Sequence, residues 1–140
     1  MAIDISKALQ FAVVSRLEAF APLTAIVPVE RLYGMQPPAN PVYPFIRYGF
    51  PITGGFEATC WDGSTVRVTL HAFAETTLSN AGEVVVSDIA SLIVQAMTDF
   101  NTDTINVIDC EFLQTRILQD GNEADRFHAI VEFSITAQPV

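Results

Sequence analysis

The sequence predicts an α+β fold, in which a mixed or antiparallel sheet of about four to six strands packs against two main helices. Two segments have apolar residues at steps of three and four, and several others alternate apolar with polar residues. Prolines and glycines separate these segments. With 140 residues, half of them hydrophobic, and with no internal repeat or linker, we expect residues 1–140 to form a single domain.

The two helices are predicted from their apolar periodicity. The first runs from Asp4 to about Ala21, and Asp4 is a plausible N-cap because its carboxylate can accept from first-turn amides. The second runs from Asn80 to about Phe100, with Asn80 and Glu83 at the spacing of a capping box. Its apolar residues extend around more than one side, so we expect it to be buried on two faces.

The strands are predicted from alternation and from β-branched and aromatic content. We expect strands over residues 31–33, 43–50, 66–73, 107–118 and 126–138. Pro51, Gly54 and Gly55 should interrupt pairing, and the Asp62-Gly63 pair is typical of a tight hairpin turn.

Composition and charge exclude some classes of partner. The formal net charge is −9, which repels phosphate, and the scattered arginines and single lysine form no phosphate-binding track. Residues 1–7 do not resemble a secretory signal, and the longest apolar run is too short to span a bilayer, so we expect a soluble protein made in the cytosol without a membrane partner. Half of the residues are hydrophobic and only 16% are charged. This apolar excess could thicken the core or cover a subunit interface, and we favour the interface because large exposed apolar patches are uncommon on monomers.

Candidate catalytic groups are few. Cys60 and Cys110 are far apart, without metal or redox spacing, and we interpret both as free thiols. His71 and His128 fall on the polar sides of two strands; they could approach each other, but a metal site needs a third ligand. The sequence has no nucleophile motif and no phosphate-binding glycine loop. We therefore predict no catalytic residue, metal or cofactor, with a small ligand-binding or enzymatic domain using His71 and His128 as the alternative.

Several apolar residues are candidates for contact with a partner protein. Trp61 lies near Phe56 in a turn that looks exposed, where it could anchor a partner or fold back over the sheet edge. The second helix has more apolar surface than one sheet can cover. The residues expected at a partner interface are Phe56, Trp61, Asp62, Val84, Val86 and Val94.

The order of the segments resembles a known family. An opening helix is followed by Arg31-Leu32-Tyr33, a proline-rich connector into Tyr43-Pro44-Phe45-Ile46, the strand Val66 to Phe73, the long helix at Asn80, and a closing hairpin with Arg126-Phe127-His128. This pattern is similar to the tail-completion family of long-tailed bacteriophages and related gene-transfer particles, which includes the tail terminators.

The resemblance implies a structural virion protein with a single tail-terminator-like domain and no catalytic residues or cofactor. Copies would form a ring, commonly a hexamer, that closes the head-proximal end of the tail tube and joins it to the head connector. The implied partners are the protein itself, the tail tube protein and head-tail connector proteins, with DNA passing through without specific binding. The expected location is the virion tail or neck, and the host cytoplasm during assembly. A neck or head-completion connector protein is the structural alternative.

Overall fold

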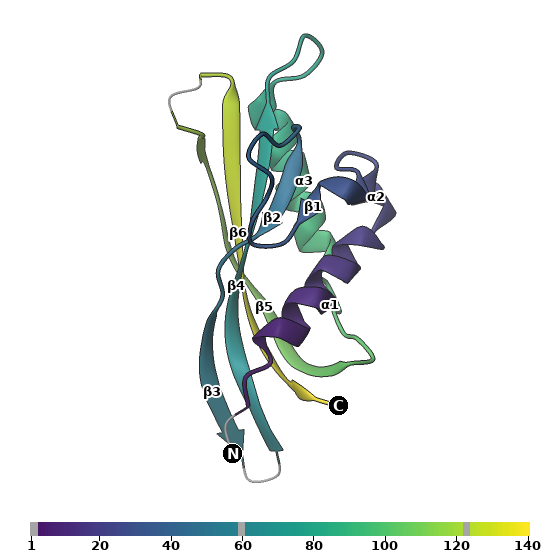
Figure 1. Cartoon of the computed structure of the whole chain (residues 1–140), viewed down its shortest axis with the longest axis vertical. Helices are drawn as coiled ribbons and strands as arrows, with labels where there is room; N and C mark the ends of the chain where they lie inside the picture. The colour runs from purple at the N-terminus through teal and green to yellow at the C-terminus, as the bar shows by residue number, and fades with distance from the viewer. Residues whose placement is uncertain (1–2, 59–60, 122–123) are drawn as a thin grey trace.

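The computed structural model describes residues 3–58, 61–121 and 124–140, and these form two layers (Figure 1). One layer holds the helices α1 (Ser6–Glu18), α2 (Ala21–Thr24) and α3 (Gly82–Ala96), with a 3-10 turn, η1 (Val29–Arg31). The other is a six-stranded sheet of β1 (Leu32–Tyr33), β2 (Phe45–Tyr48), β3 (Ile52–Ala58), β4 (Trp61–Glu75), β5 (Ile105–Gln119) and β6 (Arg126–Pro139). The predicted α+β class is confirmed.

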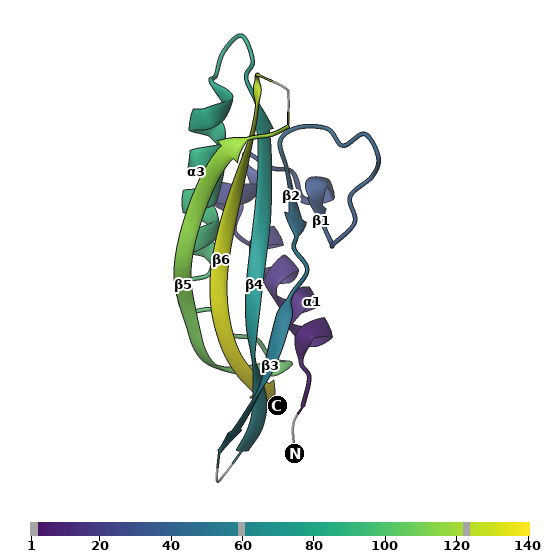
Figure 2. The same cartoon turned by 90° about the vertical axis from the view of Figure 1, so that its left-hand side faces the viewer.

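The sheet is mixed, and its two central strands are long. The strand order is β1-β2-β4-β6-β5, and β3 pairs with the first part of β4. The β1–β2 pair is parallel and the other pairs are antiparallel. Figure 2 shows β5 at one side of the sheet and β1, β2 and β3 at the other. The sheet therefore presents β5 along one whole edge.

The hydrophobic core lies between the sheet and the helices. Alternate residues of β4 and β6 face the helices, as the alternation in these segments predicts. The helices contribute residues at steps of three and four, including Leu9 and Val13 of α1 and Ile89 and Ile93 of α3, all fully buried. Burial of each such side chain contributes roughly 1.5–3 kcal/mol. The other face of the sheet, which the helices leave uncovered, is called the open face below.

The first helix is shorter than predicted at both ends. It begins at Ser6 and ends at Glu18. The Asp4 carboxylate accepts a hydrogen bond from the Ser6 N–H at 2.8 Å, as expected, although Ile5 occupies the N-cap position. Arg16 then connects α1 to the end of α3, because its Nε donates to the Ala96 carbonyl at 2.6 Å.

The predicted capping box of the long helix is wrong. The helix begins at Gly82, with Ala81 at the N-cap position and no side-chain cap there. The Thr76 hydroxyl accepts from the Gly82 N–H at 2.9 Å, so the residue that satisfies this first-turn donor comes from the preceding strand end. The backbone oxygen of Asn80 instead accepts from the Thr77 N–H at 2.8 Å. Asn80 and Glu83 therefore do not cap the helix.

The far end of the long helix also differs from the prediction. The last helical residue is Ala96, four residues before the predicted end at Phe100. Met97 follows as the C-cap, and Asp99 has a positive φ of 55°, which a continuing right-handed helix cannot adopt. Phe100 is nevertheless buried, so its apolar character reflects the core and not the helix.

The hairpin of β3 and β4 corrects two further predictions. Ile52–Ala58 is a strand, although the glycines in it were expected to interrupt pairing. Asp62 and Gly63 do not form a turn, because they pair with Glu57 and Phe56 in the ladder. The chain reverses between Ala58 and Trp61, and residues 59–60 lie outside the described residues. Continuous pairing with β3 outweighs the local turn preference of Asp-Gly here.

Candidate interaction surfaces

The tip of the β3–β4 hairpin extends beyond the rest of the sheet (Figures 1 and 2). Pairing between β4 and β6 starts at Ser64, so the first three residues of β4 pair with β3 alone. The predicted partner residues Phe56, Trp61 and Asp62 all lie in this tip. Asp62 is partly buried in the ladder. For Phe56 and Trp61 the structure describes the backbone and not the side chains.

The three valines predicted as partner contacts on α3 have different environments. Val84 is 55% exposed, and Val94 is partly buried beside the core. Val86 is fully buried with Ile89 and Ile93 on the side of α3 that faces the sheet. A partner cannot reach Val86, so its assignment to an interface is wrong. The sequence could not separate these positions because apolar residues surround much of the helix.

The edge strand β5 is exposed in a way that the sequence did not predict. It pairs with β6 along one side, and most of its residues are exposed. Its exposed large apolar residues are Ile108, Phe112, Ile117 and Leu118. Irregularities between Val107 and Asp109 and between Phe112 and Gln114 shift its alternation. The sequence pattern identified this strand, but these shifts conceal which residues face the core.

A shallow, mostly apolar groove runs between α3 and β5. It has a volume of about 370 Å³ and is lined by Ser87, Ala90, Ser91, Val94, Gln95, Phe112, Thr115 and Ile117. The helix packs mainly on β4 and β6, which leaves the helix-facing side of β5 incompletely covered. Phe112 is 45% exposed and Ile117 is 43% exposed there. The groove and the backbone edge of β5 together form the surface that we call the β5 surface.

A row of rings crosses the open face. Phe45 stacks on Phe73 with ring centroids 4.6 Å apart, and Phe73 stacks on His128 at 4.2 Å. Tyr43 contacts Phe45 edge-on at 5.2 Å, and the Arg126 guanidinium lies 5.0 Å from the centre of the Tyr43 ring. These contacts hold the end of the proline-rich connector against the sheet. The row unites residues that were noted separately in the sequence.

The two histidines meet on the open face, as the sequence allowed. His71 Nδ1 and His128 Nε2 are 2.7 Å apart, so an N–H of one ring donates to the other. Burial lowers the pKa of His71 to about 4, with smaller contributions from Arg47 and His128. Burial also lowers the pKa of His128. Both rings are therefore neutral near pH 7. Their hydrogen bond joins the neighbouring strands β4 and β6.

The open face carries charges of both signs. The sheet register places four of the seven basic residues on it, namely Arg47, Arg67, Arg116 and Arg126. The same face carries Glu75, Asp109, Glu111 and Glu132. The Arg126 Nε lies 3.7 Å from a Glu75 carboxylate oxygen. The arginines are closer together than the sequence suggests, but interspersed carboxylates prevent a continuous positive track.

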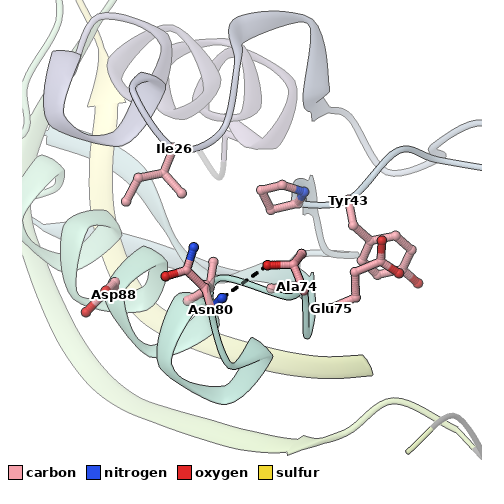
Figure 3. Close-up of a pocket in the computed structure, with 9 residues that line it drawn as sticks. Ile26, Tyr43, Ala74, Glu75, Asn80 and Asp88 are labelled. Atoms are coloured by element: carbon pink, nitrogen blue, oxygen red, sulfur yellow. Dashed lines mark hydrogen bonds between the residues drawn. The ribbon is translucent and has the colours of Figure 1, made fainter. Parts of the chain in front are cut away.

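A cavity of about 340 Å³ lies between α2, the connector and the start of α3 (Figure 3). It is lined by Ile26, Tyr43, Pro44, Ala74, Glu75, Thr77, Asn80, Val85 and Asp88. Figure 3 shows Tyr43 and Glu75 on one side and Asn80 and Asp88 on the other. The ligand-binding alternative required a pocket around His71 and His128, and neither residue lines this cavity.

The remaining candidate groups have ordinary structural surroundings. Cys110 is a free, half-buried thiol, and burial together with the Asp109 charge raises its pKa to about 11. Cys60 lies outside the described residues. Within the described ranges, no three His, Cys, Asp or Glu side chains gather as metal ligands would. No helix in the described part of the chain combines the length and apolar content needed to cross a membrane.

Comparison with known proteins identifies relatives of this fold. A chain in the virion of a native gene transfer agent particle is 19% identical, with a TM-score of 0.78 over 97% of this chain and 98% of that one. The gp17 protein of bacteriophage SPP1 is 24% identical, with a TM-score of 0.56 over 94% of this chain and 89% of that one. No curated protein sequence matches this chain.

A family model matches most of the chain as well. Residues 11–138 match the model of a family described as tail completion protein gp17. The match begins within α1 and ends one residue before the end of β6, and so includes the β3–β4 hairpin, the open face and the β5 surface. This chain belongs to the tail completion protein gp17 family.

Proposed function

We propose that this protein is a structural virion subunit that assembles into a ring, a hexamer, at the head-proximal end of a phage or gene-transfer-particle tail tube. The ring closes the tube and joins it to the head connector. Family membership and the likeness to a chain of a gene transfer agent virion support this role. The proposal includes assembly in the host cytoplasm and no catalytic activity.

The observation that carries the proposal is the β5 surface. An open edge strand of 15 residues offers unpaired N–H and C=O groups to another chain. Its apolar residues extend onto the helix-facing side, where Phe112 and Ile117 line the groove with Val94. Exposed apolar surface beside an open backbone edge is typical of a protein that pairs with another polypeptide.

The projecting hairpin tip supports a second contact, to the tail tube or the head connector. The tip contains Phe56, Trp61 and Asp62, and it extends away from the β5 edge, so both surfaces can be occupied together (Figure 2). An aromatic residue at a projecting position is a frequent anchor at protein interfaces. We assign the tip to the partner ring or tube and the β5 surface to ring assembly.

The acidity of the chain fits a ring through which DNA passes. Six copies at −9 each would carry a formal charge of −54. Exposed charges act over only about 8 Å at physiological salt. DNA would therefore experience weak repulsion near the ring surface and no attachment to it. The mixed charges of the open face are consistent with this absence of specific binding.

The direct test is electron microscopy of the purified protein, alone and mixed with tail tubes, together with its mass in solution. We expect rings at one end of the tubes. A protein that remains monomeric at high concentration with tubes present would refute the role. Binding to purified connector but not to tubes would identify a neck protein instead.

Substitution of the tip separates its role from that of the ring. Trp61→Ala should leave the fold and ring mass unchanged while reducing the fraction of tubes that carry a ring and join heads. Val29→Ala, at an exposed position on η1, serves as a control for loss of an apolar side chain. Normal head-tail joining by Trp61→Ala particles would show that the tip does not contact the partner.

A further inference from the structure

The sheet has two free backbone edges on opposite sides. One is β5, which pairs with β6 alone, and the other includes β3, which pairs with β4 alone among the described residues. Each edge leaves a row of backbone donors and acceptors without a partner strand. A sheet with two such edges can be continued in both directions by further copies of the same chain.

Gly54, within β3, has no evident function inside its own chain. Among the described residues, a Cβ at this position would meet only the Thr65 carbonyl oxygen, at 3.9 Å, and the Gly54 backbone is outside the positive-φ region that favours glycine. Glycine inside a strand costs stability because it loses more conformational entropy on folding than other residues. Glycine within a strand also marks positions where another backbone approaches closely. The described contacts of the fold do not require a glycine here, which leaves close approach of another chain as a reason for it.

The glycine lies at the same height along the strands as the first irregularity in β5. Gly54 is opposite Thr65, Thr65 is opposite Thr136, and Thr136 is opposite Asp109. The extra residue of β5, Ile108, immediately precedes Asp109, and its side chain is exposed. A strand that pairs with this part of β5 must follow a local bend and leave room for an exposed isoleucine. A glycine at the same height can follow the bend and also leave room for the isoleucine side chain.

We propose that β3 of a second copy pairs with the 105–111 half of β5, placing Gly54 of that copy against the irregularity at Ile108. This inference rests on the ring proposed above and identifies its subunit contact. Within one chain, β3 is antiparallel to β5, because three successive antiparallel pairings separate them. Rotation about an axis parallel to the strands keeps the direction of each strand. If copies are related in this way, β3 of the next copy is antiparallel to the β5 strand that it pairs with. A contact between two different surfaces produces a ring when the rotation between copies closes, and an open filament when it does not.

Apolar content favours a second copy at this edge. The charged residue of β3 is Glu57, and those in the 105–111 half of β5 are Asp109 and Glu111. These carboxylates repel one another, so the contact depends on backbone pairing and on the apolar residues. Ile52 of β3 is 70% exposed on the open face, at the height of Glu111 of β5. Pairing would cover this isoleucine together with Ile108.

The size of the contact requires the groove as well as the strand edge. Stable interfaces use about 20–30 residues on each side, and β3 has only seven. The α3–β5 groove lies on the helix-facing side of the same edge, and its lining residues Val94, Phe112 and Ile117 extend the contact. The β5 surface as a whole is therefore the receiving side of the subunit interface.

The first test replaces the glycine. Gly54→Val adds a β-branched side chain in open space, so the isolated subunit should fold with unchanged or slightly higher stability. Its association, measured by sedimentation, should weaken at least tenfold, with Gly54→Ala intermediate. Thr53→Val is the matched control, because it adds no volume at the adjacent position and should associate normally. Normal association by folded Gly54→Val would overturn the proposal.

The second test detects the contact directly. In a Cys60→Ala, Cys110→Ala background, Ile52→Cys and Glu111→Cys are combined in one chain, because directly opposite residues in antiparallel strands have Cβ atoms about 5 Å apart. A short bismaleimide should give a ladder of covalent oligomers longer than dimers, while each single-cysteine variant should remain monomeric on a denaturing gel.

The outcomes separate this contact from the proposed function. Rings of the expected mass that yield no ladder would refute the β3–β5 contact and leave the tail role intact. Dimers from Glu111→Cys alone would show that two β5 strands pair with each other, which also refutes it. A protein that stays monomeric in the presence of tail tubes would refute both proposals.

Discussion

Gly82, the first residue of α3, should tolerate no larger side chain. A Cβ there would lie 2.8 Å from the Thr76 nitrogen, 2.9 Å from the Glu75 carbonyl carbon and 2.9 Å from Phe127 Cδ2. Two of these three atoms belong to the backbone of the β4 end, which is fixed by its pairing, so little relaxation is available. The Thr76 hydroxyl also bonds to the Gly82 N–H, and any shift of the helix would weaken this bond.

The expected cost of Gly82→Ala follows from opposing contributions. Overpacking of a rigid site costs about 1–3 kcal/mol, and partial loss of the threonine bond adds up to about 1 kcal/mol. Alanine recovers up to about 1 kcal/mol through its helix propensity. The last two contributions are of similar size and opposite sign, so the net loss should be about 1–3 kcal/mol, and for 140 residues each kcal/mol lowers Tm by roughly 3 °C.

Urea unfolding and thermal unfolding of the isolated subunit measure this effect. Gly54→Ala is the matched control, since its Cβ would make only an ordinary contact, and it should be neutral or stabilising by up to about 1 kcal/mol. If Gly82→Ala proves as stable as the wild type, the close packing of α3 against the β4 end is not rigid and the reasoning is wrong.

Two further changes test buried groups. Tyr48 is fully buried, and its hydroxyl has no hydrogen-bond partner among the described residues; Tyr48→Phe should therefore raise the free energy of unfolding by about 1 kcal/mol, and a comparable loss in urea unfolding would contradict this. The pKa of His71 falls from 6.5 to about 4 on folding. As the pH falls from about 6.5 to 4, the unfolded chain therefore binds a proton at His71 that the folded chain does not, and the free energy of unfolding decreases. Allowing for partial exposure, wild type should lose about 1 kcal/mol more than His71→Gln between pH 7 and pH 5, and equal losses would show that His71 does not contribute.

The sequence predicted most elements of the fold because their patterns are local. The periodicity of residues 4–21 and the alternation of β6 identify a helix and a strand directly. The long helix was located, but its ends were not, because Thr76 caps it from the β4 end and Phe100 is buried without being helical. β3 was missed because its pairing partner, and not its glycine-rich sequence, determines its conformation.

The candidate surfaces were less accessible to prediction. The sequence placed Trp61 and Phe56 near a hairpin, and the structure places both in its projecting tip. It could not distinguish Val86, in the core, from the exposed Val84, because both lie on an apolar helix. The edge position of β5 depends on strand order, which no residue of β5 encodes by itself. Surfaces that arise from topology therefore required the structure.

The two irregularities of β5 limit which strands can pair with this edge. A long, flat, apolar edge would accept almost any extended segment, including those of misfolded chains, and would invite fibrous aggregation. The extra residues bend this edge at two places, between Val107 and Asp109 and between Phe112 and Gln114. Only a strand that bends at the same places can pair along its length. The bends therefore restrict which extended segments can pair along the whole of this edge.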